Sequence, residues 1–162
     1  MFLFGQRCLC VPNGVSHVPQ EQGKDLDRRS MDLAGEPSWI RSNLQIHTHG
    51  STMTAHDWLQ VVSCAGDYVF AGLFPDDPVK QQALSRLVAV VRKILSVTSD
   101  ADDDDRDQID VLKLETIEAL VWCERALPKT ELAVMFHILV HVPDMMYRWN
   151  RSANFWCFWG ER

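Results

Sequence analysis

The chain has 162 residues, of which 46% are hydrophobic and 23% charged, enough for one globular domain with a buried core. Its formal charge is −6, and six aspartates and one arginine between residues 100 and 107 account for −5 of it. The remaining chain is nearly neutral, which argues against a free-standing DNA-binding protein, because such proteins are normally basic. The sequence contains no run of 18 apolar residues, the length that a membrane-spanning helix needs. Its five cysteines do not show the spacing of a disulfide framework. We therefore expect an intracellular protein with reduced thiols and no membrane partner.

Residues 1–51 show neither helical nor strand periodicity, and proline and glycine interrupt them repeatedly. We predict a largely unstructured N-terminal arm over this stretch. The pattern changes near Thr52, so we predict that a helical domain occupies residues 52–162.

Two helices are predicted in the first half of this domain. Apolar residues repeat every three or four positions from Thr54 to Leu73, as in an amphipathic helix, and Thr54 with Asp57 resembles a capping box. Asp77 and Pro78 then form a helix start, with the aspartate as N-cap and the proline at the first helical position. The stripe that follows, which ends at Leu95, is the clearest helical signal in the chain.

An acidic loop over residues 98–108 separates these helices from two more. Consecutive like charges repel one another and stay solvated, and the run lacks the central glycine and final glutamate of a calcium-binding loop. A third helix is predicted from Gln108 to Leu127. A fourth, from Leu132 to Val142, is apolar nearly all round, which predicts a central position, and Pro143 is expected to stop it. The predicted fold is all-α, with about four helices in a compact bundle.

His137 and His141 lie four residues apart on the fourth predicted helix, so their side chains share one face. This spacing can chelate a metal ion, and His56 and Cys123 could complete a zinc site if the fold brought them close. However, the sequence H-I-L-V-H lacks the glutamate that metalloproteases place after the first histidine. We favour two core histidines that hydrogen-bond to the backbone or to a neighbouring helix.

Two other groups of residues could carry chemistry. His56 and Asp57 form a histidine–carboxylate pair, although a helix N-terminus explains them more simply because no nucleophile stands in a recognisable context. Arg148 and Trp149 begin an aromatic C-terminal stretch that could stack on bases, but such a stretch more often closes a helical core.

The order of motifs from Met53 to Arg162 resembles a domain of unknown function found in CACTA (En/Spm) transposon proteins after the catalytic region. That family opens with K-S-H-D-C-H-V-L and continues through R-L-C-x-F-F-N-x-L-C-S and L-C-x-L-E-x-x-F-P-P to H-L-x-V-H-L and R-W-M-Y-P-F-E-R-Y-L-G. The corresponding segments here are residues 54–59, 85–96, 118–128 and 137–142, then Arg148-Trp149 with Glu161-Arg162.

Three departures qualify the resemblance. Leu59 replaces the second histidine of the opening motif, the gap between Arg148 and Glu161 is longer than in the family, and the family continues as a helix where this chain stops at Arg162. We therefore expect a fragment truncated inside its last motif.

The resemblance implies a role beside a DNA-cleaving core. Transposases of this class are expected to cut DNA with three carboxylates that hold two Mg²⁺ ions, and a helical insertion would precede the last carboxylate. By this resemblance Glu161 would be that carboxylate, and the chain alone would need no cofactor and would catalyse nothing. Its partner would be the remainder of a transposase in the nucleus, through which alone it would meet DNA.

A second hypothesis is a free-standing helical interaction module derived from a transposon. Its aromatic C-terminal face would then dock on a partner or on a second copy of the chain.

Overall fold

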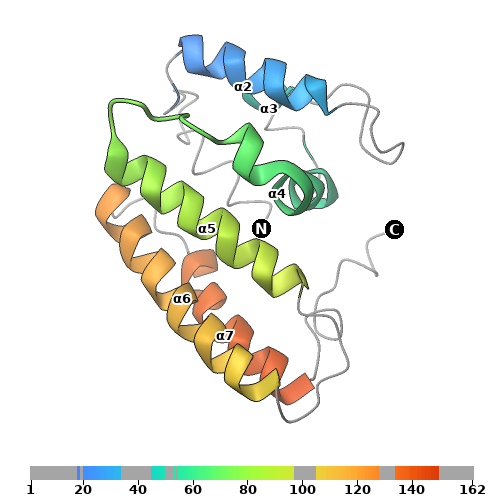
Figure 1. The fold of residues 1–162 in the computed structure, drawn as a ribbon, viewed down its shortest axis with the longest axis vertical. Helices are drawn as coiled ribbons and strands as arrows, with labels where there is room; N and C mark the ends of the chain where they lie inside the picture. Colours follow the sequence, from blue (N-terminus) through green and yellow to red (C-terminus); the bar gives the residue numbers. More distant parts are fainter. Residues whose placement is uncertain are drawn as a thin grey trace.

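The computed structural model describes residues 18, 20–33, 45–49, 53, 55–96, 105–127 and 134–149, and all regular structure in these ranges is helical. The all-α prediction is confirmed. The helices are α2 (Gln20–Asp32), α3 (Ile46–His49), α4 (Ala55–Val69), α5 (Pro78–Ser96), α6 (Asp105–Ala126) and α7 (Val134–Trp149). In Figure 1, α5 and α6 run side by side in opposite directions, and α2 lies on the side of α4 away from α5, with α3 packed against α2.

The central element is α5, because it is buried on two faces. One face, with Leu84, Val88 and Val91, belongs to a core shared with α2, α3 and α4. The other face contributes to two smaller cores shared with α6 and α7, through Ala83, Leu87, Val90 and Ile94. Each set recurs at three- and four-residue spacing. The predicted stripe drew residues from both sets and left out Ala83 and Val90, which are also buried.

The start of α5 confirms the predicted cap. The Asp77 carboxylate accepts a hydrogen bond from the backbone N–H of Lys80 at 3.0 Å, and Pro78 is the first helical residue. This hydrogen bond is the main cause that lowers the pKa of Asp77. The Gln81 side chain fixes the connection to α4, since it accepts from the Phe74 N–H at 3.1 Å and donates to the Phe70 carbonyl at 3.0 Å.

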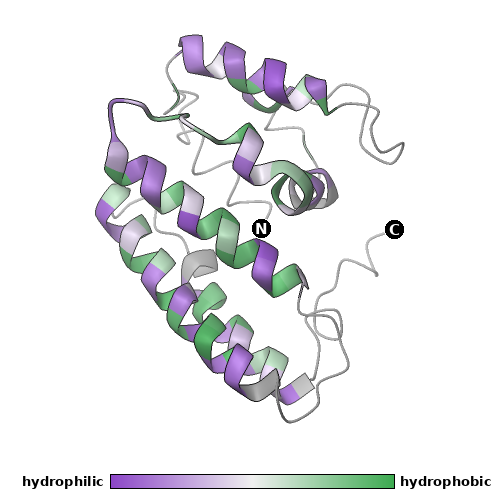
Figure 2. Cartoon of the chain, in the orientation of Figure 1, coloured by the Kyte–Doolittle hydropathy of each residue, from purple (hydrophilic) through white to green (hydrophobic). Residues whose placement is uncertain are grey.

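The prediction of little regular structure before residue 52 was wrong for α2 and α3. Most of α2 is hydrophilic (Figure 2), but Leu26 is only 1% exposed and belongs to the main core. Gly23 lets α3 approach, because a Cβ at this position would lie 2.6 Å from the His47 ring. The Asp27 carboxylate accepts the backbone N–H of His47 at 2.6 Å. Contacts that are distant in sequence therefore stabilise α2, and periodicity does not report them.

Pro143 does not stop the last helix, contrary to the prediction. It lies inside α7, which continues to Trp149. A proline inside a helix lacks the N–H that would bond to the carbonyl of residue 139 and costs about 3 kcal/mol. Here Pro143 is fully buried beside Val142 and Met146, both of which belong to a core cluster. The burial of this segment offsets the local cost, so the helix continues.

The acidic segment is also shorter than predicted. Because α6 begins at Asp105, residues 105–108 are helical and not part of a loop. The rest of the predicted loop, residues 98–104, lies outside the described residues. Aspartates in a first turn interact favourably with the helix dipole, by about 0.3–1 kcal/mol each. Like-charge repulsion along the sequence therefore did not prevent helix formation here.

Candidate functional site

The two histidines of α7 face solvent, so the expectation of two core histidines was wrong. His137 and His141 are both exposed, and their Nε2 atoms lie 3.3 Å apart. Their ring centroids are 4.9 Å apart and the ring planes meet at 83°. The pair is therefore an accessible unit on one helix face, with two ring nitrogens directed at each other.

Among the described residues, Cys123 does not join the two histidines in a possible zinc site, and the His56 side chain lies outside these residues. Cys123 is 2% exposed and packs with Ala83, Leu87 and Leu120, away from solvent. Within the ranges that the structure describes, no group of three or more His, Cys, Asp and Glu side chains is placed to hold a metal ion. The histidine pair thus offers two ligands, and the described side chains supply no third.

Asp144 lies one turn beyond His141 and joins α7 to α6. Its carboxylate accepts a hydrogen bond from the Lys113 ammonium at 2.7 Å. This bond is the main cause that lowers the pKa of Asp144, and the charges of Lys113, His141 and Arg148 act in the same direction. Asp144 is therefore ionised and close to the histidine pair, but it is engaged by Lys113.

The remaining predicted residues are only partly placed. Asp57 lies in the first turn of α4, as predicted, and is 6% exposed. Thr54 and the His56 side chain lie outside the described part of the chain. Arg148 is exposed in the last turn of α7, where its charge suits the helix dipole. The side chain of Trp149, and both Glu161 and Arg162, also lie outside the described residues.

A second apolar face on α6 escaped the sequence analysis. Val111, Leu114, Ile117 and Val121 are 54%, 68%, 40% and 38% exposed, and they recur at three- and four-residue spacing. They lie opposite the buried residues of the same helix, which include Leu112 and Cys123. In Figure 2, hydrophobic and hydrophilic positions are mixed along the coloured part of α6. We call these four residues the α6 ridge. The three- and four-residue spacing of these residues can be read from the sequence. A helix is usually assigned one apolar stripe, so the second apolar stripe of α6 was not identified.

Acidic side chains border the α6 ridge. Asp107, Asp110, Glu118 and Glu124 of α6 are exposed, and the basic residues described on this helix are Lys113, which is half-buried, and Arg125. Glu118 pairs with Arg86 of α5 at 2.6 Å. The described side chains of α6 therefore carry more acidic than basic charge around the ridge, with Lys113 and Arg125 as the basic ones.

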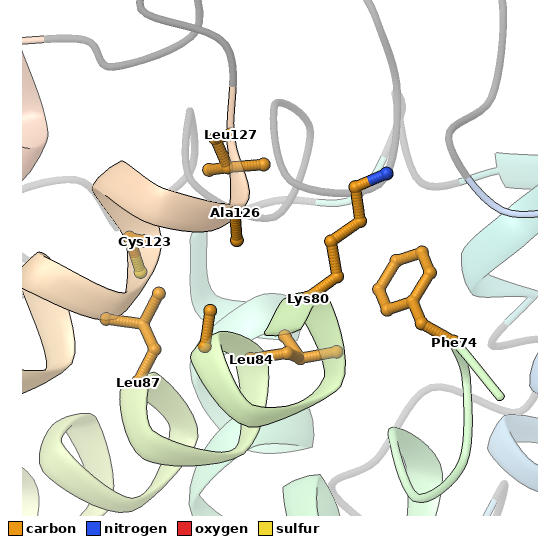
Figure 3. A pocket seen from close by; sticks show the side chains of 8 residues that line it. Phe74, Lys80, Leu84, Leu87, Cys123, Ala126 and Leu127 are labelled. Atoms are coloured by element: carbon orange, nitrogen blue, oxygen red, sulfur yellow. The ribbon is translucent and has the colours of Figure 1, made fainter. Parts of the chain in front are cut away.

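The cavity between the start of α5 and the end of α6 is too small and apolar to be a ligand site. In Figure 3, Leu87 of α5 lies beside Cys123 of α6, and the Lys80 amine points away from both. The cavity has about 20 Å³ of room for the centre of a water-sized molecule, and a single water needs roughly 10–15 Å³. Burial, with a smaller contribution from Glu124, raises the pKa of the Cys123 thiol to about 12. The thiol is therefore a packing group, not a nucleophile.

Comparison with known protein families, curated proteins and solved structures found no match. No helix among the described residues is long and apolar enough to cross a membrane. Two exposed features of the described helices could bind a ligand or a partner: the histidine pair on α7 and the α6 ridge.

Proposed function

We propose that this chain is a non-catalytic helical interaction module of a CACTA-type transposon protein, and that its α6 ridge docks on a basic surface of the DNA-cleaving part. The observation that carries the proposal is the second apolar face of α6. Burial of a large aliphatic side chain gains about 1.5–3 kcal/mol, and four such side chains in one row are 38–68% exposed. An apolar row bordered by polar residues is typical of a docking surface.

The charge around the ridge favours a basic partner over a second copy of the chain. Self-association through this face would bring the acidic borders of two ridges together, and like charges across an interface oppose binding. A protein that cleaves DNA carries basic surface to hold phosphates. A negative border is complementary to such a surface, and the expected location would then be the nucleus.

The test is a binding titration of the full chain with the catalytic region of an intact CACTA-type transposase. Leu114→Lys (L114K) places a charge at the most exposed ridge position and should weaken binding at least about tenfold, or about 1.4 kcal/mol. Val79→Lys is the matched control, because Val79 is 38% exposed on α5 and lies off the ridge. Asp110→Lys should weaken binding and reduce its salt dependence, since it removes charge complementarity.

Two results would contradict this proposal. Equal binding by L114K and the Val79 control would mean that the ridge is not the contact. A chain that forms a defined dimer through the ridge, with no affinity for the catalytic region, would instead identify a free-standing module that pairs with itself.

The resemblance also assigns Glu161 as the last metal-binding carboxylate of the parent enzyme. Mg²⁺ bound there would activate water or a 3′-hydroxyl and stabilise the leaving oxygen. One carboxylate cannot hold two metal ions, so the chain alone should be inert. Glu161→Ala in an intact full-length relative should abolish excision, and excision at the normal rate would remove Glu161 from the proposal.

A further inference from the structure

We propose that His137 and His141 form a binding site for a divalent first-row transition metal such as Zn²⁺ or Ni²⁺ on the exposed face of α7. This inference is independent of the α6 ridge, which lies on another helix and needs no metal.

The spacing of the two ring nitrogens fits one shared ion. Zinc–imidazole bonds are about 2.0–2.1 Å long, and two ligands at a tetrahedral angle around one ion are then about 3.3–3.4 Å apart. The observed Nε2–Nε2 separation is 3.3 Å. The ring planes meet at 83°, so the two imidazoles approach edge-on and are not stacked. The distance between their Nε2 atoms therefore already suits an ion bound by both.

The chemistry of the surroundings selects the class of ion. Imidazole is a good ligand for Zn²⁺, Ni²⁺ and Cu²⁺, whereas Mg²⁺ and Ca²⁺ prefer oxygen ligands. The closest described carboxylate along the same face is Asp144, and Lys113 holds it at 2.7 Å. The described residues supply no third ligand, so the site is open on their side and weaker than a four-ligand structural zinc site.

The position of the pair gives the bound ion a structural consequence. Pro143 cannot donate a hydrogen bond to the carbonyl of residue 139, which lies midway between the two histidines. An ion that links His137 to His141 would cross-link the turn that the proline leaves short of one hydrogen bond. Metal binding should therefore stabilise α7 as well as occupy its surface.

The test compares the untagged full chain with the variant I138H/H141I. The exchange keeps the composition, and both positions are exposed, but it puts the histidines at neighbouring positions that point in different directions. The other histidines and cysteines are the same in both proteins, so the comparison isolates this pair. Titration with Zn²⁺ alone and with Ni²⁺ alone, followed by calorimetry, gives the affinities, and Mg²⁺ is the control ion.

The wild-type chain should bind both transition metals at least about tenfold more tightly than the variant, because loss of an outer-shell partner alone costs about 10–100-fold in metal affinity. Its melting temperature should rise with Zn²⁺, and that of the variant should rise less. Equal zinc and nickel affinities in the two proteins would overturn the proposal. So would a wild-type chain that prefers Mg²⁺, or one whose melting temperature responds to zinc no more than that of the variant.

Discussion

Truncation of the buried Pro143 to alanine should make the protein more stable. The substitution removes two ring carbons from a fully buried position, which costs about 1.6 kcal/mol at roughly 0.8 kcal/mol per buried methylene. It also removes a penalty of about 3 kcal/mol for proline inside a helix and restores an N–H donor. The net expectation is a gain of about 1.4 kcal/mol in the free energy of unfolding.

Val142→Ala is a closely matched control, because it removes two carbons from the adjacent buried residue of the same helix. It should destabilise the protein by about 1.6 kcal/mol or somewhat more, since a cavity remains. Urea unfolding followed by circular dichroism gives both values from the shift in midpoint at constant slope. If Pro143→Ala destabilises the protein as much as Val142→Ala does, α7 does not continue through residue 143 as an ordinary helix.

Two further predictions concern packing and pH. Gly66→Ala should destabilise the protein by about 1–3 kcal/mol, because its Cβ would lie 2.6 Å from Val88 Cγ1 of α5; Val88→Ala in the same chain should recover part of that loss in a double-mutant cycle. At neutral pH, iodoacetamide should modify the exposed Cys64 but not the buried Cys123, as read by peptide mass spectrometry. Between pH 9 and 12 the unfolded chain releases the Cys123 proton and the folded chain keeps it, so stability should fall as pH rises, with a smaller fall in Cys123→Ala.

The parts of the fold that local chemistry determines could be predicted from the sequence. The start of α5 depends only on neighbouring residues, namely the Asp77 N-cap and Pro78 at the first helical position. The structure confirms this start and the apolar stripe that follows it. Contacts between distant segments could not be predicted in this way. In α2, the Arg29 guanidinium donates to the carbonyls of Tyr68 and Ala71 at the end of α4, and no pattern within α2 reports this pairing.

For the candidate sites, too, the sequence predicted the local spacing but not the contacts between distant segments. The four-residue spacing of His137 and His141 placed them on one face, as observed, but their exposure depends on which side of α7 packs against α6. The burial of Pro143 overrode a local rule that normally ends helices. The α6 ridge was present as a pattern, but only the packed structure separates the buried stripe of α6 from the exposed one.

The most direct test of the docking surface is the rate at which a thiol on the ridge is alkylated. In Leu114→Cys, the new thiol and the natural Cys64 are both exposed, so Cys64 serves as an internal reference. On addition of the transposase catalytic region, alkylation at position 114 should slow at least about tenfold, as for a site in a well-packed interface, while Cys64 should react at its original rate. Equal rates at position 114 with and without a bound catalytic region would contradict the assignment of the α6 ridge as the docking surface.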